Sequence, residues 1–367
     1  MDTADTADTA DTASSRTAVR DPLHDRPPPT ARPAHERLLI WATGLSLVAV
    51  TTLVGCRVIG VDGVTPVPQL LAFLPWSLVP IGVATVFAVL LRWRGGLVWA
   101  LVVLAVAGRY GLPYGPQAAT AATAATATAT GTGTGTERPV VAHLEVLTSN
   151  VEFGQATLGL IETVRREQPD VVFVQECEYI CAQLLNARIP RADYPYRHVV
   201  KAGQAEGSAI LSVLPLTDTD GIEGTLSMPG SEAVVGGRTV RLQLVHPLPP
   251  VPGGVDAWRR ELDRIRTYAT AHRDAPLILA GDFNATRDHA AFRAVLDGGE
   301  LRDSAALAGA GRTPSWPAAV PRPLGAQIDH VLISKDFSVR RARFLDLADT
   351  DHRALLVALD LHAPARR

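Results

Sequence analysis

Lysine, cysteine and aromatic residues are scarce in this chain of 367 residues. Only two lysines occur, Lys201 and Lys335, so arginine supplies nearly all of the positive charge. The 35 basic and 37 acidic residues give a net charge of -2, which excludes the global positive field of many nucleic-acid-binding proteins without excluding a polyanionic partner. Three cysteines are too few for a disulfide-stabilised scaffold.

The chain also lacks the short signatures of several hydrolase classes. It contains no Gly-x-Ser-x-Gly nucleophile turn, no His-Glu-x-x-His zinc helix and no Gly-x-x-x-x-Gly-Lys phosphate loop. These absences argue against an α/β-hydrolase esterase, a zinc peptidase and a P-loop nucleotide hydrolase.

Apolar residues are abundant and unevenly distributed. They make up 47% of the chain, with a mean hydropathy of +0.13, which is high for a soluble protein and low for a multi-span transporter. Residues 1–37 repeat Asp-Thr-Ala and then become rich in proline and charge, as in a disordered tail. Apolar runs at 38–59, 70–91 and 95–112 predict a membrane region over residues 38–112 with about three transmembrane helices.

Arginines flank these runs unequally. Five precede the first run: Arg16, Arg20, Arg26, Arg32 and Arg37. Arg92 and Arg94 separate the second run from the third. The positive-inside rule therefore predicts a multi-pass cell-membrane protein with a cytoplasmic N-terminus, and three crossings place the following domain on the extracellular side. If the third run is not a span, that domain lies inside instead. Residues 113–137, rich in Ala, Thr and Gly, are expected to form a linker.

Residues 138–367 have the pattern of one α/β domain. Runs rich in β-branched and apolar residues predict strands at 140–147, 171–174, 240–245, 276–280, 331–333 and 355–359. Apolar residues on one face predict a helix at 155–167 and another that contains Trp258, Leu262 and Ile265. Alternation of strands and helices is typical of an α/β fold.

Polar side chains collect where the predicted strands begin or end. They are Asn150, Glu176, His246, Asp282, Asn284, Asp329, Asp351 and His352. Taken singly, each has a structural explanation as a cap, a turn residue or a surface acid. Strand ends are also the usual position of functional groups in such sheets, and the coincidence of the whole set in one domain favours a functional site.

The order of the motifs resembles the endonuclease/exonuclease/phosphatase superfamily, which includes pancreatic deoxyribonuclease, apurinic endonucleases, sphingomyelinases and inositol polyphosphate phosphatases. The motifs are TSN (148–150), PDVVFVQE (169–176), GSAILS (207–212), VHP (245–247), GDFNAT (281–286), IDHVL (328–332) and TDHRAL (350–355). The resemblance covers nearly all of residues 140–362. It implies a four-layer α/β sandwich of two packed mixed β-sheets flanked by helices. It does not cover the membrane region, although membrane-anchored bacterial members with this arrangement of membrane region and domain are familiar.

The resemblance implies a metal site. Glu176 would hold a divalent metal ion, with Asn150 and Asp351 nearby as direct or water-mediated ligands. Oxygen ligands suit Mg²⁺ or Mn²⁺ better than zinc. Glu152 stands where some members carry a further metal-binding acid, and its role is left open.

The resemblance also implies five catalytic residues: His246, Asp282, Asn284, Asp329 and His352. Asp282 would orient or deprotonate the attacking water, and Asn284 would bond that water or the phosphate. His352, aligned by Asp329, would stabilise charge on phosphorus, and His246 would assist at the leaving oxygen. Phosphoester hydrolysis needs an in-line water, neutralisation of developing charge and protonation of the leaving group, so each chemical need has a candidate.

Two small departures and two open alternatives accompany the resemblance. Ser149 stands where many members have tryptophan, and Ser208 where they have asparagine or threonine. Cys177 and Cys181 are either a disulfide of an exported domain or two free or buried thiols. Trp316 is either an aromatic contact for substrate or a packed loop residue.

The sequence therefore predicts a membrane-tethered, divalent-metal-dependent hydrolase of phosphodiester bonds, either a nuclease or a phosphodiesterase. The expected partners are a phosphoester substrate (nucleic acid, nucleotide or phospholipid headgroup) and the lipid bilayer, and no protein partner is inferred. The alternative is a non-catalytic extracytoplasmic binding or signalling module on the same scaffold. Such a module should have lost at least one ionisable or amide group of the site, and all are present.

Overall fold

The computed structural model of the chain describes residues 32–111 and 138–364. The expected tail at 1–37 and the expected linker at 113–137 lie outside the described residues, apart from residues 32–37. The first helix, α1 (Ala34–Ile59), begins inside the expected tail.

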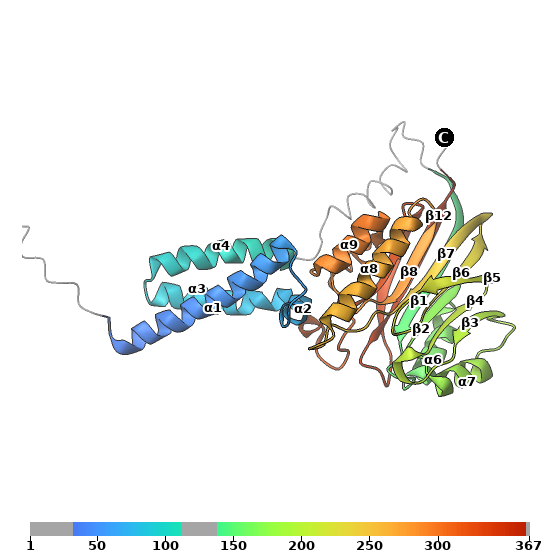
Figure 1. The fold of residues 1–367 in the computed structure, drawn as a ribbon, viewed down its shortest axis with the longest axis horizontal. Coiled ribbons are helices and arrows are strands. Elements are labelled where there is room, and N and C mark those ends of the chain that lie inside the picture. The colour runs from blue at the N-terminus through green and yellow to red at the C-terminus, as the bar shows by residue number, and fades with distance from the viewer. Residues whose placement is uncertain (1–31, 112–137, 365–367) are drawn as a thin grey trace, which may run out of the picture.

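Residues 32–111, here called the helical segment, contain only helices and short connections. The elements after α1 are α2 (Val67–Ala72), the 3-10 helix η1 (Leu74–Ser77), α3 (Leu78–Leu90) and α4 (Arg94–Gly111). Figure 1 shows α1, α3 and α4 lying side by side and extending away from the strands. Leu47, Ala84 and Ala100 pack between these helices. Apolar side chains such as Leu45 and Val83 are exposed on the outside of the same bundle.

The expectation of about three transmembrane helices is wrong. In residues 32–111 and 138–364, α1 alone is long and apolar enough to cross a bilayer. The second apolar run is interrupted between α2 and η1, which leaves an apolar helix of only Leu74–Leu90, shorter than the about 20 residues that a span requires. The third run corresponds to α4, which has 18 residues, begins at Arg94 and carries Arg109 in its last turn; Leu112 lies outside the described residues.

The topology expected from the arginines loses its basis with this correction, because it required three crossings. By length and composition alone, α1 fits a membrane span, and its place near the N-terminus also fits a signal sequence.

The domain that follows contains two six-stranded mixed sheets. The first sheet has the order β11 (Phe337–Asp346), β12 (Arg353–His362), β1 (Val140–Asn150), β2 (Val171–Gln175), β4 (Ser208–Ser212) and β3 (Tyr196–Val200). The second has the order β5 (Leu216–Ile222), β6 (Met228–Val235), β7 (Arg238–Val245), β8 (Leu277–Asp282), β10 (Asp329–Ile333) and β9 (Arg302–Asp303). Each sheet has one parallel pair, β1 with β2 and β7 with β8.

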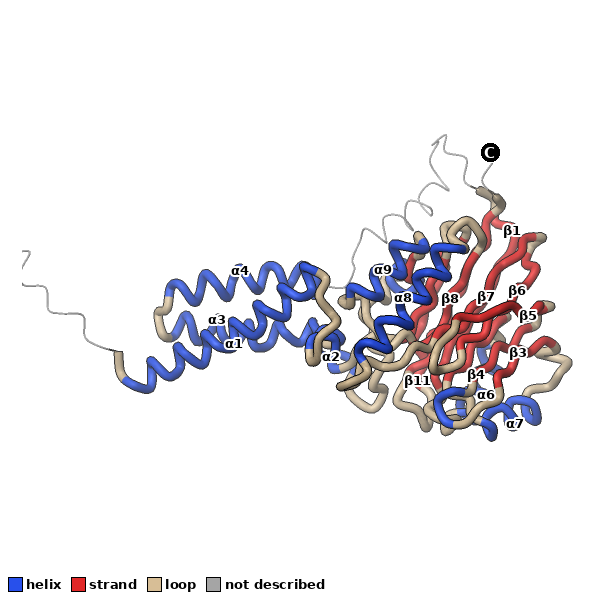
Figure 2. The backbone as a smooth tube through the Cα atoms, in the orientation of Figure 1, coloured by secondary structure: helices blue, strands red, loops and turns tan. Residues whose placement is uncertain are grey.

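Helices cover the outer faces of both sheets. The helices and 3-10 helices of the domain are α6 (Thr157–Glu167), α7 (Tyr179–Arg188), η3 (Gln204–Glu206), α8 (Val255–Ala271), α9 (Ala290–Gly299), α10 (Ser304–Leu307) and η4 (Arg322–Leu324). α6 and α7 pack on the first sheet through a buried cluster that includes Leu160 and Leu185. α8 and α9 pack on the second through Trp258 and Phe292, and Figure 2 shows both helices along one side of the strands.

A third apolar cluster fills the space between the sheets. Val146 and Phe173 of the first sheet meet Leu242, Ile278 and Val331 of the second, and all five side chains are fully buried. The layers therefore run helix, sheet, sheet, helix, and the predicted four-layer α/β sandwich is confirmed.

Strand pairing brings the motif residues to one edge. Asn150 pairs with Gln175 across the parallel β1 and β2, and Asp329 pairs with Asp282 across the antiparallel β10 and β8. β7 and β8 approach so closely at Gly281 that a Cβ there would lie 1.9 Å from the carbonyl oxygen of Val245. The glycine of the GDFN motif is therefore required by strand packing.

The helical segment docks on the loop between β8 and α9. Asp288 in this loop accepts hydrogen bonds from Arg57 Nε at 2.9 Å and from Arg312 Nη1 at 2.7 Å. Nε2 of His289, in the same loop, lies 2.8 Å from the carbonyl oxygen of Pro68. Arg57, the one charge in the first apolar run, is thus buried in an ion pair with the domain.

We expect Asp288→Asn to weaken this docking. The substitution keeps the shape of the side chain and removes the negative charge that faces two largely buried arginines, so the free energy of unfolding should fall by about 3 kcal/mol. Chemical denaturation of the full chain in detergent micelles measures the loss. The matched control is Asp297→Asn at an exposed position of α9, which should change stability by less than about 0.5 kcal/mol. Equal stability of both variants would contradict the assigned role of Asp288.

Candidate active site

The structure brings all eight predicted residues to the same edge of the two sheets. Each lies at, or within two residues of, a strand end. From the first sheet come Asn150 at the end of β1, Glu176 after β2, and Asp351 with His352 before β12. From the second come His246 after β7, Asp282 at the end of β8, Asn284 two residues later, and Asp329 at the start of β10.

The backbone at this edge is strained. Glu152, Phe153, Glu176 and Asn284 have φ angles of 44°, 54°, 58° and 47°. Residues other than glycine rarely adopt the left-handed region, and each such residue costs about 1 kcal/mol or more. Strain of this kind concentrates at functional sites, where the surrounding structure holds side chains in a required direction.

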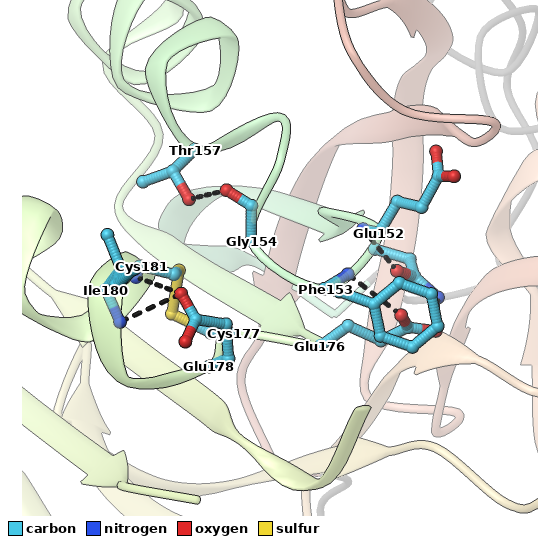
Figure 3. The surroundings of a disulfide bond; sticks show 10 residues. Glu152, Phe153, Gly154, Thr157, Glu176, Cys177, Glu178, Ile180 and Cys181 are labelled. Atoms are coloured by element: carbon cyan, nitrogen blue, oxygen red, sulfur yellow. Dashed lines mark hydrogen bonds between the residues drawn. A yellow bond between two sulfur atoms is a disulfide. The ribbon is translucent and has the colours of Figure 1, made fainter. Parts of the chain in front are cut away.

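Asn150 links two carboxylates of the site. Its Nδ2 donates to Oε1 of Glu176 at 2.9 Å and to Oδ2 of Asp282 at 3.2 Å. The other carboxylate oxygen of Glu176 accepts the backbone N–H of Phe153 at 3.0 Å, a contact drawn in Figure 3. Asn150 and Asp282 are buried and Glu176 is nearly so, and directed hydrogen bonds hold both carboxylates.

His352 joins the two sheets at the site. Its Nδ1 lies 2.9 Å from Oδ2 of Asp329, while its Nε2 lies 3.7 Å from Oδ2 of Asp282 and 3.7 Å from Oδ1 of Asp351. Burial disfavours the charged imidazolium, but the charges of Asp329 and Asp282 and the hydrogen bond to Asp329 outweigh burial and raise the pKa of His352 to about 10. The ring is therefore a cation at neutral pH.

The pKa values of Asp282 and His246 shift in the directions that burial dictates. Burial raises the pKa of Asp282 to about 7, against the opposing charge of His352. Burial and the charge of His352 lower the pKa of His246 to about 3, so this second imidazole is neutral. His246 Nε2 lies 3.7 Å from Oε1 of Glu176 and 3.9 Å from Oδ2 of Asp282.

Asn284 orients Asp282. The backbone N–H of Asn284 donates to Oδ1 of Asp282 at 2.8 Å, and its side-chain Nδ2 donates to the carbonyl oxygen of Pro247 at 3.0 Å. The amide is thereby fixed between the ends of β7 and β8.

Oxygen atoms, the ligands that a hard divalent cation prefers, are available at this edge. Glu176, Asn150 and Asp351 offer oxygen atoms, and Oδ1 of Asp329 is buried without a hydrogen-bond partner among the described residues. Among the described residues, the acidic and histidine side chains whose ligand atoms lie within 4.8 Å of one another as a group of three are those of Asp282, Asp329 and His352. His352 is a poor ligand in that second group, because its Nδ1 is bound to Asp329 and a protonated ring has no free electron pair.

Three contacts were not predicted as parts of the site. Glu152, whose role the sequence left open, accepts the backbone N–H of Asp351 at 2.8 Å through Oε2. Trp316 donates from Nε1 to Oδ2 of Asp351 at 2.7 Å. Cys177, directly after Glu176, forms a disulfide with Cys181 of α7. The neighbouring motif residues were the available signal for Glu152 and Cys177, whereas nothing local to Trp316 points to Asp351.

A sequence model of the Endonuclease/Exonuclease/phosphatase family matches residues 147–352, more than half of the chain, and the chain therefore belongs to this family. The predicted family is confirmed. Its members are phosphoesterase hydrolases, so the chain belongs to a family of hydrolases.

The solved structures that the chain matches are distant in sequence. D. rerio TDP2 humanized by 14 mutations is 17% identical, with a TM-score of 0.47, over 59% of this chain and 98% of that one. The human Nocturnin catalytic domain with bound sulfate is 17% identical, with a TM-score of 0.47, over 61% and 96%. An endonuclease/exonuclease/phosphatase from Beutenbergia cavernae is 17% identical, with a TM-score of 0.45, over 60% and 72%. No curated protein matches at a significant level.

The His352–Asp329 pair predicts a pH dependence of stability. Because the pKa of His352 rises from 6.5 to about 10 on folding, the pair contributes fully below pH 6.5 and its contribution is lost as the pH rises through about 10. In EDTA, His352→Gln should therefore lower the free energy of unfolding more at pH 6 than at pH 10. Since each pKa unit is worth about 1.4 kcal/mol, we expect a difference above about 2 kcal/mol.

Denaturant titrations at the two pH values measure this difference. The control is His143→Gln, which removes a largely exposed histidine that also faces an aspartate, Asp360. The same loss for His352→Gln at both pH values would show that the ring is not protonated by folding.

Proposed function

We propose that the protein is a divalent-metal-dependent phosphoesterase that hydrolyses phosphodiester bonds and is tethered to a membrane. The observation that carries the proposal is the convergence of carboxylates, amides and two histidines from both sheets at one strained, largely buried edge. Membership of the family supports hydrolysis of a phosphoester. The substrate classes to be compared are nucleic acids, nucleotides and phospholipid headgroups.

Glu176, Asn150 and Asp351 would hold Mg²⁺ or Mn²⁺. When bound, the metal ion would neutralise charge on the phosphoryl oxygens and favour attack by water. The hydrogen bonds that Glu176 accepts from Asn150 and from the backbone of Phe153 fix the direction of its carboxylate.

Asp282 is the proposed general base. Its pKa of about 7 lies near neutral pH, where a carboxylate combines a useful population of the basic form with affinity for a proton. The N–H of Asn284 holds Oδ1 of Asp282, and the amide of Asn150 bonds Oδ2. Together these bonds orient the carboxylate that would take a proton from the attacking water.

His352 and His246 are assigned different tasks. The imidazolium of His352, aligned by Asp329, would stabilise negative charge on the phosphoryl oxygens as water attacks. His246 is neutral, so it would donate a hydrogen bond to the leaving oxygen, and that oxygen would receive the proton that the attacking water releases.

Hydrolysis of bis-(p-nitrophenyl) phosphate by the full chain in detergent tests the proposal. We expect turnover with Mg²⁺ or Mn²⁺, none in EDTA, and a loss of about 10²-fold or more in Asp282→Ala and in His352→Ala. Asp297→Ala, at an exposed position of α9, is the control and should retain activity. No turnover with any metal by the folded protein would instead favour a monoesterase or the non-catalytic binding or signalling module.

α1 is the proposed membrane tether. Its C-terminal end is held by the Arg57–Asp288 ion pair, and the bundle that it forms with α3 and α4 has exposed apolar side chains. A cleaved signal sequence would remove these contacts, so we infer that α1 is retained. The Cys177–Cys181 disulfide supports an oxidising, extracytoplasmic location for the domain.

Cell fractionation tests the tether. We expect the full chain to stay in the membrane pellet after alkaline carbonate extraction. Because Cys177 and Cys181 are buried, we expect them to resist alkylation by maleimide in denaturant until a reductant is added. Release into the supernatant would contradict a spanning α1. Labelling of both thiols without reductant would contradict the extracytoplasmic location.

A further inference from the structure

The helical segment reaches a second loop beside the site. Phe73, between α2 and η1, packs against Trp316 with ring centroids 6.2 Å apart and an interplanar angle of 47°. The backbone of Trp316 forms an isolated bridge with Ala326. The indole is therefore held through its own backbone and through a ring contributed by a distant part of the chain.

The polar edge of this indole points at the site. Trp316 donates from Nε1 to Oδ2 of Asp351 at 2.7 Å. Asp351 also has backbone restraints, since its N–H donates to Glu152 and its carbonyl oxygen accepts from Ala318. These backbone bonds leave the side-chain torsions of Asp351 unrestrained, and 41% of that side chain is exposed. The hydrogen bond from the indole N–H orients the carboxylate of Asp351, which the backbone bonds do not.

We propose that Trp316, braced by Phe73, is a positioning residue that fixes the carboxylate of Asp351 for metal binding. The inference rests on the proposed function in one respect, the assignment of Asp351 as a metal ligand. Packing alone would require an apolar ring at this position, whereas a short hydrogen bond to a site carboxylate requires the indole N–H. The helical segment thereby holds the loop that carries Trp316, in addition to the loop that follows Asp282 and Asn284.

Trp316→Phe in the full chain separates positioning from packing. The variant keeps an aromatic ring against Phe73 and removes the N–H donor. We expect Mn²⁺ to bind about tenfold more weakly by isothermal titration calorimetry, as when a partner of a metal ligand is removed. The midpoint of thermal unfolding in EDTA should stay within about 2 °C of wild type, because the packing is retained.

A double-mutant cycle links Phe73 to the same effect. Phe73→Ala should weaken Mn²⁺ binding in the same direction, because the indole loses its support. If Phe73 acts through the Trp316 N–H, the two substitutions remove the same interaction. The fold-loss of Mn²⁺ affinity in the double variant should then be smaller than the product of the fold-losses in Phe73→Ala and Trp316→Phe. The matched control is Trp99→Phe, which removes an indole N–H from Thr51 Oγ1 within the helical segment and should bind Mn²⁺ like wild type.

Three results would overturn the inference. They are wild-type Mn²⁺ affinity in Trp316→Phe, a fall in unfolding midpoint that accounts for the lost affinity, and a wild-type protein that binds no divalent metal. A wild-type protein that binds Mn²⁺ but hydrolyses no phosphoester would refute the proposed function alone, and the comparison of Mn²⁺ affinities would still decide the role of Trp316.

Discussion

The apolar contact between the two sheets is the constraint on which the site depends. Side chains such as Phe173 and Ile278 are fully buried there, and close packing leaves the sheets little freedom to slide. Their relative position determines whether the end of β8 meets the end of β1. The His352–Asp329 bond crosses between the sheets at that edge, so a shift of one sheet would separate a charged pair as well as open the core.

A dense group of charges is the consequence of this packing. Asp282 and Asp329 are almost fully buried, with His352 as the facing cation. Burial raises the pKa of Asp282, and burial with the charge of His352 lowers that of His246. The pKa of His352 is raised against the effect of burial by the charges of Asp329 and Asp282. Groups shifted in these ways can divide the work of base, cation and neutral donor at one pH. The same arrangement costs stability, as do the strained residues beside it.

The helical segment packs against loops beside the active site. From its hydropathy it was expected to be a membrane anchor, separated from the domain by a linker. In the structure its Arg57 and Pro68 bond to the loop after the GDFN motif, and its Phe73 packs against Trp316 in a second loop. Its orientation relative to the active site is therefore specified by buried polar and aromatic contacts. Hydropathy also overcounted the spans, because it does not register the break between α2 and η1.

The sequence by itself determined the six strands β1, β2, β7, β8, β10 and β12, the helices α6 and α8, the family and the residues that meet at the site, whereas the other six strands of the two sheets were not predicted. The predicted features depend on local periodicity and on short motifs at strand ends, which one sequence displays directly. Only the tertiary structure decided that Trp316 bonds Asp351, that Arg57 pairs with Asp288, and that Cys177 and Cys181 are joined. The first two contacts link residues 35 and 231 positions apart, and the packing of helices and sheets sets such distances. The cysteines are close in sequence, but their bonding depends on how the chain turns between β2 and α7.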